Sequence, residues 1–75
     1  MELETFDFTQ FGYLAYAYDE GLLPLQVLNS PGGWYIGTSS DIGEPISRES
    51  IEYWETQEQA QSAFDQKSWT QKPNP

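Results

Sequence analysis

The chain contains no cysteine and no histidine, and only three of its 75 residues are basic. Without cysteine it can form no disulfide, no thiolate metal site and no thiol nucleophile. Without histidine it also lacks the side chain that most often serves as general base or metal ligand. Most of the usual catalytic side chains are therefore missing, and we expect neither an enzyme nor a cofactor.

Basic residues are scarce while acidic residues are abundant, because twelve Asp and Glu against three Lys and Arg give a formal net charge of −9. Nucleic acids and anionic lipids are normally bound through Lys and Arg, so we expect no direct nucleic-acid binding and no membrane binding. Long apolar runs are absent, and residues 1–4 are acidic where a secretory signal needs positive charge. We therefore expect a cytoplasmic protein whose charge mainly serves solubility.

Aromatic residues are plentiful, at 16% of the chain, whereas a disordered acidic segment would contain few. The length allows one domain, which buries only about 60–65% of its unfolded surface. We place this domain at residues 1–67, with residues 1–10 loosely attached and a short edge strand around Phe6 and Phe8. Residues 68–75 contain two prolines and are predicted to form a flexible C-terminal tail.

The densest strand-like run is Trp34-Tyr35-Ile36-Gly37-Thr38. It follows Asn29-Ser30-Pro31-Gly32-Gly33, where proline fixes φ and glycine permits positive φ, so the chain can reverse direction. The apolar residues 25–28 before this turn predict a partner strand and hence a hairpin over residues 25–38. On the central strand Trp34 and Ile36 share one face and Tyr35 the other, and Gly37 leaves room for a close neighbour.

Residues 12–20 fit two periodicities. A strand would place Leu14, Tyr16 and Tyr18 on one face, whereas a helix would align Phe11, Leu14, Ala15 and Tyr18. Three tyrosines within six residues favour a pleated surface, and residues 19–21 suit a three-residue hairpin loop. We therefore predict a strand.

A single helix from Ile46 to Gln66 would have two apolar faces, because Ile51 and Trp54 fall opposite Ala60 and its neighbours. A break resolves the conflict, with a strand through residues 51–54 followed by Thr56 as N-cap, Gln59 as its capping-box partner and a helix over about 57–66. This helix is too short to be stable alone and must pack on the sheet. The predicted fold is α+β, an antiparallel sheet of three to four strands with one C-terminal helix packed on a face.

We find no catalytic, metal or cofactor site. Residues 31–33 lack the spacing and the lysine of a phosphate-binding loop. The loop with Asp41, Gly43 and Glu44 lacks the alternating oxygen ligands and the bidentate Glu of a calcium loop. Nothing identifies which of the twelve acids would form an acid–base pair.

The run Ser47-Arg48-Glu49-Ser50 is the most distinctive polar segment, because Arg48 is the sole base before Lys67. Arg48 either neutralises neighbouring carboxylates or anchors a protein interface, where arginine and aromatic residues are enriched. The aromatic side chains are too numerous for so small a core, so some must be exposed. The predicted interface consists of Trp34, Tyr35, Arg48, Tyr53 and Trp54.

Part of the chain resembles a pattern seen elsewhere. The matching residues are residues 33–38, Gly43-Glu44-Pro45, residues 47–50, Tyr53, Thr56 and Ala60. They resemble small uncharacterised bacterial, cyanobacterial and phage-borne proteins with a YIGT…SRES…Y..T..A pattern. The similarity covers residues 33–64 only; it implies the order strand, loop, strand, helix and no function.

Two functional hypotheses follow. The first is a small acidic, non-catalytic protein-protein interaction module that uses exposed aromatics to bind an unknown protein partner, with a monomer as default. The alternative is an acidic, nucleic-acid-mimicking decoy that inhibits a nucleic-acid-binding protein. The decoy needs carboxylates spaced like duplex phosphates, for which the candidates are Glu49, Glu52, Glu55 and Glu58, although this run crosses the predicted strand-to-helix break.

Overall fold

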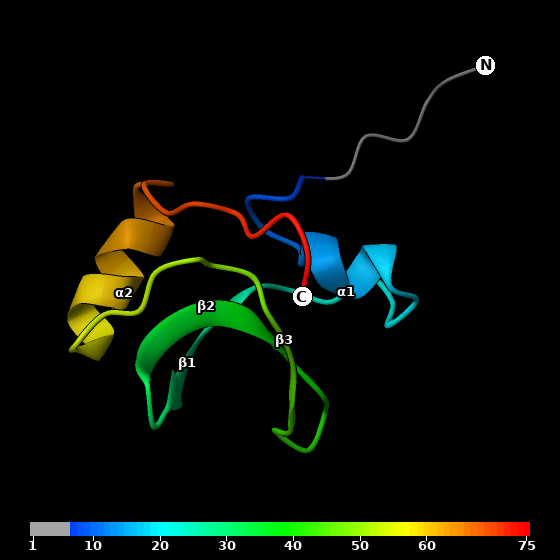
Figure 1. The fold of residues 1–75 in the computed structure, drawn as a ribbon, viewed down its shortest axis with the longest axis horizontal. Helices are drawn as coiled ribbons and strands as arrows, with labels where there is room; N and C mark the ends of the chain where they lie inside the picture. The colour runs from blue at the N-terminus through cyan, green and yellow to red at the C-terminus, as the bar shows by residue number, and fades with distance from the viewer. Residues whose placement is uncertain (1–6) are drawn as a thin grey trace.

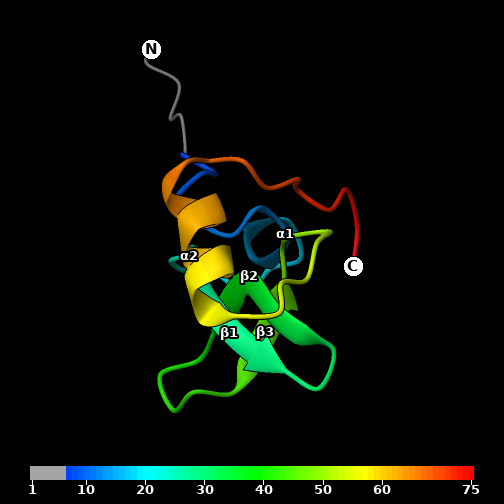
Figure 2. The same cartoon turned by 90° about the vertical axis from the view of Figure 1, so that its left-hand side faces the viewer.

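A computed structural model describes residues 7–75 of the chain (Figure 1). In chain order the elements are α1 (Tyr13–Ala17), β1 (Gln26–Ser30), β2 (Gly33–Ser39), β3 (Pro45–Arg48) and α2 (Gln57–Asp65). The strands form one antiparallel sheet in the order β1, β2, β3. Both helices lie on the same side of the sheet, α2 against β1 and β2 and α1 against β3 (Figure 1 and Figure 2). The predicted α+β class is confirmed.

The predicted hairpin is confirmed, and β2 is the central strand. Its register runs from Gln26 opposite Gly37 to Ser30 opposite Gly33, so Pro31 and Gly32 form the turn. Gly33 has a φ of 126°, a conformation that favours glycine. Strand alternation places Ile36, which is completely buried, on the face that carries the helices.

The strand predicted over residues 12–20 is wrong, because Tyr13–Ala17 form the helix α1. The adjacent residues Leu14 and Ala15 of this helix are both buried. The first-turn amides of a helix have no partner within the helix. Here the amides of Leu14 and Ala15 donate to the Glu49 carboxylate, over 2.9 Å to Oε1 and 3.1 Å to Oε2.

The hairpin loop predicted at residues 19–21 is also absent, because this segment ends α1. The Glu20 amide donates to the Ala15 carbonyl over 2.7 Å, which satisfies one of the free carbonyls at the helix end. Asp19 and Gly21 have positive φ, 67° and 99°, which turns the chain away from the helix axis. The left-handed glycine predicted at position 21 is present, but it follows a helix.

The strand predicted over residues 51–54 is misplaced. The strand here is β3, residues 45–48, after which residues 51–53 leave the sheet as a loop. Trp54 rejoins the sheet through a bridge to Trp34, in which the two backbones exchange two hydrogen bonds of 2.8 Å. Ser50 allows this departure, because its Oγ accepts from the Ile36 amide over 3.0 Å and donates to the Glu52 carbonyl over 2.9 Å. A side chain thus replaces the backbone partner that a continuous strand would supply.

The C-terminal helix is predicted almost to the residue. Thr56 is the N-cap and forms a complete capping box with Gln59, as its position three residues earlier indicates. Ala60 and Ala63 are buried, so the small side chains let α2 lie close to the sheet. The start of the helix is set by residues close in the sequence, which is why sequence reasoning located it.

Residues 70–72, within the segment predicted to be a flexible tail, are hydrogen-bonded to the loop that follows β3. The Ile51 amide donates to the Thr70 carbonyl over 2.9 Å, and the Lys72 amide donates to the Glu49 carbonyl over 2.7 Å. Ser50 and Gln71 form a bridge between these contacts. The C-terminal segment therefore extends the sheet region beside β3.

Part of the predicted N-terminal edge strand lies at residues 1–6, outside the described residues. Phe8, which is described, lies in a turn. Within residues 7–75, no helix has both the length and the apolar character needed to cross a bilayer.

Candidate functional site

Three of the five predicted interface residues meet at the loop 51–53. The guanidinium carbon of Arg48 lies 4.6 Å from the centroid of the Tyr53 ring, within cation–π distance. The Tyr53 ring meets the Tyr35 ring edge to face, with centroids 6.0 Å apart. We call Tyr35, Arg48 and Tyr53 the Tyr53 cluster. Because Arg48 pairs with Gly37 and Tyr35 precedes Gly37 by two residues, both belong to the sheet face opposite the helices.

Gly37 makes room for this cluster. A Cβ at position 37 would collide with the Ser47 carbonyl oxygen and would lie 2.8 Å from Cε2 of Tyr35. The Tyr35 ring therefore covers Gly37, and this ring is the close neighbour that the sequence predicted at this glycine. A side chain at position 37 would displace both the Tyr35 ring and β3.

Arg48 is fixed by backbone carbonyls. Its Nη1 donates to the carbonyls of Ser50 and Ile51 over 2.8 and 2.9 Å, and no carboxylate among residues 7–75 forms an ion pair with it. Of the two interpretations of Arg48, charge neutralisation by direct pairing is therefore not what the geometry shows. The guanidinium holds the loop 51–53 in place and lies against the Tyr53 ring.

Burial divides the two tyrosines of the cluster. Tyr35 is 6% exposed whereas Tyr53 is 46% exposed. Burial raises the pKa of Tyr35, the neighbouring Tyr53 raises this pKa further, and the positive charge of Arg48 opposes the rise. Tyr35 is thus the buried support of the cluster, and Tyr53 is the ring that a partner can contact.

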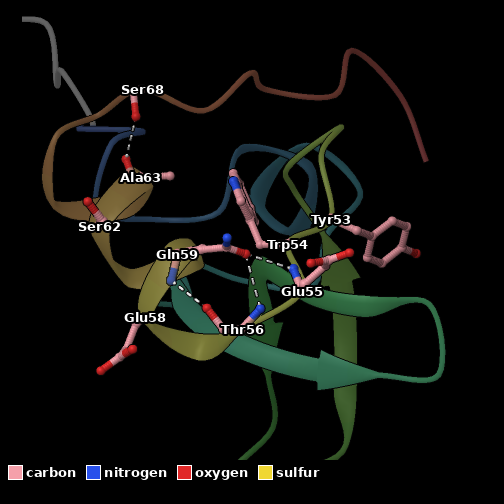
Figure 3. A pocket seen from close by; sticks show the side chains of 9 residues that line it. All are labelled: Tyr53, Trp54, Glu55, Thr56, Glu58, Gln59, Ser62, Ala63 and Ser68. Atoms are coloured by element: carbon pink, nitrogen blue, oxygen red, sulfur yellow. Dashed lines mark hydrogen bonds between the residues drawn. The ribbon is translucent and has the colours of Figure 1, made fainter.

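Trp54 lines a groove on the other side of the same segment. Its indole and the Tyr53 ring point to different sides of the chain (Figure 3). The groove has a volume of about 870 Å³ and lies between residues 53–56 and α2. Trp54 and Ala63 contribute apolar surface, and the charged residues in its lining are Glu55 and Glu58. We call it the Trp54 groove.

The capping box holds the backbone at the edge of the Trp54 groove. The side-chain Oε1 of Gln59 accepts from the amides of Glu55 and Thr56 over 3.1 and 3.3 Å, as Figure 3 shows. This fixes the backbone from which the Glu55 side chain extends. Among residues 7–75 no donor is hydrogen-bonded to the carboxylate of Glu55 or Glu58, and both residues are exposed. The two carboxylates extend to different sides of this region (Figure 3).

The four acids considered for nucleic-acid mimicry do not form one exposed row. Glu49 is completely buried, and its carboxylate accepts from the hydroxyl of Ser47 over 2.6 Å and from Nε2 of Gln71 over 2.7 Å, besides the two α1 amides. Glu52 accepts from the Thr70 amide over 2.9 Å. Burial raises the pKa of Glu52, but hydrogen bonding from Thr70 and from the backbone of Glu52 together outweighs burial, so the pKa is lowered. Only Glu55 and Glu58 of this run are exposed.

Sequence reasoning missed Glu49 and the groove. The only available signal for Glu49 was strand alternation, which places Ser47 and Glu49 on the face opposite Arg48 and toward the core. A carboxylate at such a position is normally expected in solvent, since acids are seldom fully buried without partners. Within residues 7–75, no three acidic side chains are grouped so that they could hold a metal ion.

The chain matches no family model, and neither a curated protein nor a solved structure shows significant similarity to it. The resemblance of residues 33–64 to small bacterial and phage-borne proteins therefore stays a prediction.

Proposed function

We propose that the chain is a small, non-catalytic protein-binding module whose contact surface consists of the Tyr53 cluster and the Trp54 groove. One observation carries the proposal: a half-exposed tyrosine supported by a buried tyrosine and an arginine lies directly beside a tryptophan-lined groove. Tyrosine, tryptophan and arginine are the residues that contribute most to binding energy at protein interfaces.

The rigidity of this surface supports the proposal. Arg48 anchors the loop 51–53 through two carbonyls, and the Trp34 bridge and the Gln59 side chain hold the segment on either side of Trp54. Side chains that are fixed before binding lose less conformational entropy when a partner arrives. A preformed aromatic surface therefore favours binding over a purely structural role.

A selection from a random peptide display library tests the proposal. Wild-type protein should enrich a set of related peptides, and Tyr53→Ala should lose them because the exposed ring is removed. The matched control is Tyr18→Ala, which removes a tyrosine of similar exposure, 48% against 46%, at the end of α1. Circular dichroism melts establish that each variant is folded.

Two results contradict the proposal. One is that wild type enriches no peptide family. The other is that Tyr53→Ala retains the same peptides as Tyr18→Ala. Binding that disappears at moderate ionic strength and ignores Tyr53 would instead support the acidic decoy, because screening weakens exposed charges far more than apolar contacts.

A further inference from the structure

We propose that the outer edge of β1 binds an extended basic segment of a partner protein as a fourth strand of the sheet. This edge is separate from the Tyr53 cluster and the Trp54 groove, so the inference goes beyond the proposed function. The sheet order is β1, β2, β3, and no strand within residues 7–75 lies beyond β1. Because α2 contacts both β1 and β2, it packs across their face (Figure 2).

The hydrogen bonds of β2 show which backbone groups of β1 point outward. The amides and carbonyls of Trp34 and Ile36 bond to residues on the β3 side of β2, at positions 54 and 49–50. Across the hairpin these two residues lie opposite Asn29 and Val27. Both pairs are therefore non-hydrogen-bonded pairs of the ladder, and the amides and carbonyls of Val27 and Asn29 point to the outer edge. No hydrogen bond from the described residues reaches these four groups.

The two edges of the sheet differ in how they are protected. Just past β3, residues 70–72 bond to residues 49–51 on the outer side, and Pro73 and Pro75 follow. Charged residues, proline and β-bulges are the usual means of keeping an edge strand from pairing. Residues 26–30 contain no charge and no proline, and their register with β2 is regular. β1 is therefore the edge that can accept another strand.

The geometry disfavours a second copy of β1 as the occupant. A two-fold axis at Leu28 would pair the outward groups of two copies, and it would place Pro31 of one copy opposite Leu25 of the other. That place is taken, because the Leu25 amide donates to the Gln10 carbonyl over 2.8 Å. The net charge of −9 on each chain also opposes self-association and attracts basic segments. A short basic strand fits both conditions.

A hollow at the start of β1 adds a side-chain preference. It has a volume of about 350 Å³, its lining includes the apolar residues Leu25 and Phe64, and its charged lining residues, Asp65 and Lys67, have opposite signs. A strand residue opposite Val27 would have Leu25 as its diagonal neighbour on the same face. An apolar side chain at that position would enter the hollow, while basic residues at the ends of the strand stay in solvent.

Selection from two peptide display libraries tests the inference on the full chain. The members are eight-residue peptides with six random positions, flanked by lysine in one library and by glutamate in the other. The lysine library should yield a family that binds Tyr53→Ala as well as wild type, and the glutamate library should yield none. When the most enriched lysine-flanked peptide is added to ¹⁵N-labelled protein, the amides of Val27 and Asn29 should become protected from hydrogen exchange. The amides of Gln26 and Leu28 bond to β2 and should be protected already.

A proline at the edge tests the backbone contact. Asn29→Pro removes an outward amide, so the hydrogen bonds between β1 and β2 remain. The peptide should bind about 2–12-fold more weakly, which is the value of one hydrogen bond. Asn29→Ala is the matched control, because it removes the exposed side chain and keeps the amide. If a circular dichroism melt shows that Asn29→Pro is unfolded, exchange protection in wild type decides alone.

Several results would overturn the inference. They are equal enrichment from both libraries, unchanged exchange at Val27 and Asn29 when peptide is bound, and equal affinity of Asn29→Pro and Asn29→Ala. Protection of these amides that rises with protein concentration without peptide would identify a second copy as the occupant. If every enriched peptide depends on Tyr53, the proposed function stands and this inference fails. If the enriched peptides depend only on the β1 edge, this inference stands and the proposed contact surface fails.

Discussion

Replacement of the buried Glu49 carboxylate should destabilise the whole domain. Glu49 is completely buried, yet its two oxygens accept from the backbone amides of Leu14 and Ala15, from the Ser47 hydroxyl and from the side-chain Nε2 of Gln71. These donors come from α1, β3 and the C-terminal segment. One side chain therefore joins three parts of the chain that have few other hydrogen bonds between them.

The magnitude follows from the donors that each substitution leaves without a partner. Glu49→Ala leaves two buried backbone amides unsatisfied, at about 1–3 kcal/mol each, so the loss should be about 2–6 kcal/mol. A domain of this length has a total stability of about 4–11 kcal/mol. Glu49→Ala should therefore unfold the protein or bring it close to unfolding.

Glu49→Gln is the sharper test, because it keeps the shape of the side chain. The NH₂ group of the glutamine faces hydrogen-bond donors that a carboxylate oxygen accepted from before. The expected loss of folding stability is about 2 kcal/mol. With a urea dependence of about 1 kcal/mol per molar for a chain of this size, the unfolding midpoint should fall by about 2 M. Unfolding followed by circular dichroism measures this shift.

Glu44→Gln is the control for the loss of one negative charge. Glu44 is exposed in the β2–β3 loop, and its substitution should change stability by less than about 0.5 kcal/mol. Amide hydrogen exchange gives a second measurement, since the amides of Leu14 and Ala15 should lose protection in Glu49→Gln. Equal midpoints for Glu49→Gln and Glu44→Gln would refute the reasoning.

Gly37→Ala forces a methyl group into the Ser47 carbonyl and should cost the upper end of about 1–3 kcal/mol. Gly43→Ala is the comparison, because a Cβ there meets no atom within 4 Å and costs only the strain of a left-handed backbone, about 1–2 kcal/mol. Equal urea midpoints for the two variants would contradict the close packing at Gly37. Thr56→Ala should lower stability by about 1 kcal/mol, and Thr56→Ser should lower it by much less because serine retains the capping oxygen. A thermal melt in which Thr56→Ser is no more stable than Thr56→Ala would exclude the capping box as the cause. The raised pKa of Tyr35 means that the folded state holds the phenol proton more tightly than the unfolded state, so stability present below pH 10.0 is lost as the pH rises through the folded pKa. Tyr35→Phe should remove this alkaline loss in urea unfolding, and an unchanged profile would contradict the burial of the Tyr35 hydroxyl.

The sequence alone determined the elements whose signals are local. Pro31 and Gly32 predict the turn, and the apolar runs on either side predict β1 and β2. Thr56 and Gln59 predict the start of α2, because a capping box involves residues only three apart. The face division of β2 was predictable too, since side chains alternate along any strand.

Tertiary structure decided α1, the loop 51–53 and the Trp54 groove. Residues 12–20 fitted a helix and a strand alike, and the partner that satisfies the α1 amides is Glu49, which lies 34 and 35 residues away. The loop 51–53 exists because Ser50 and Arg48 hydrogen-bond to backbone groups that a strand would otherwise use. The groove needs α2 and Trp54 on one side of that loop. At α1 and at the loop 51–53 a polar side chain satisfies backbone groups in the folded chain, and no periodicity in a sequence records which backbone groups a side chain will meet.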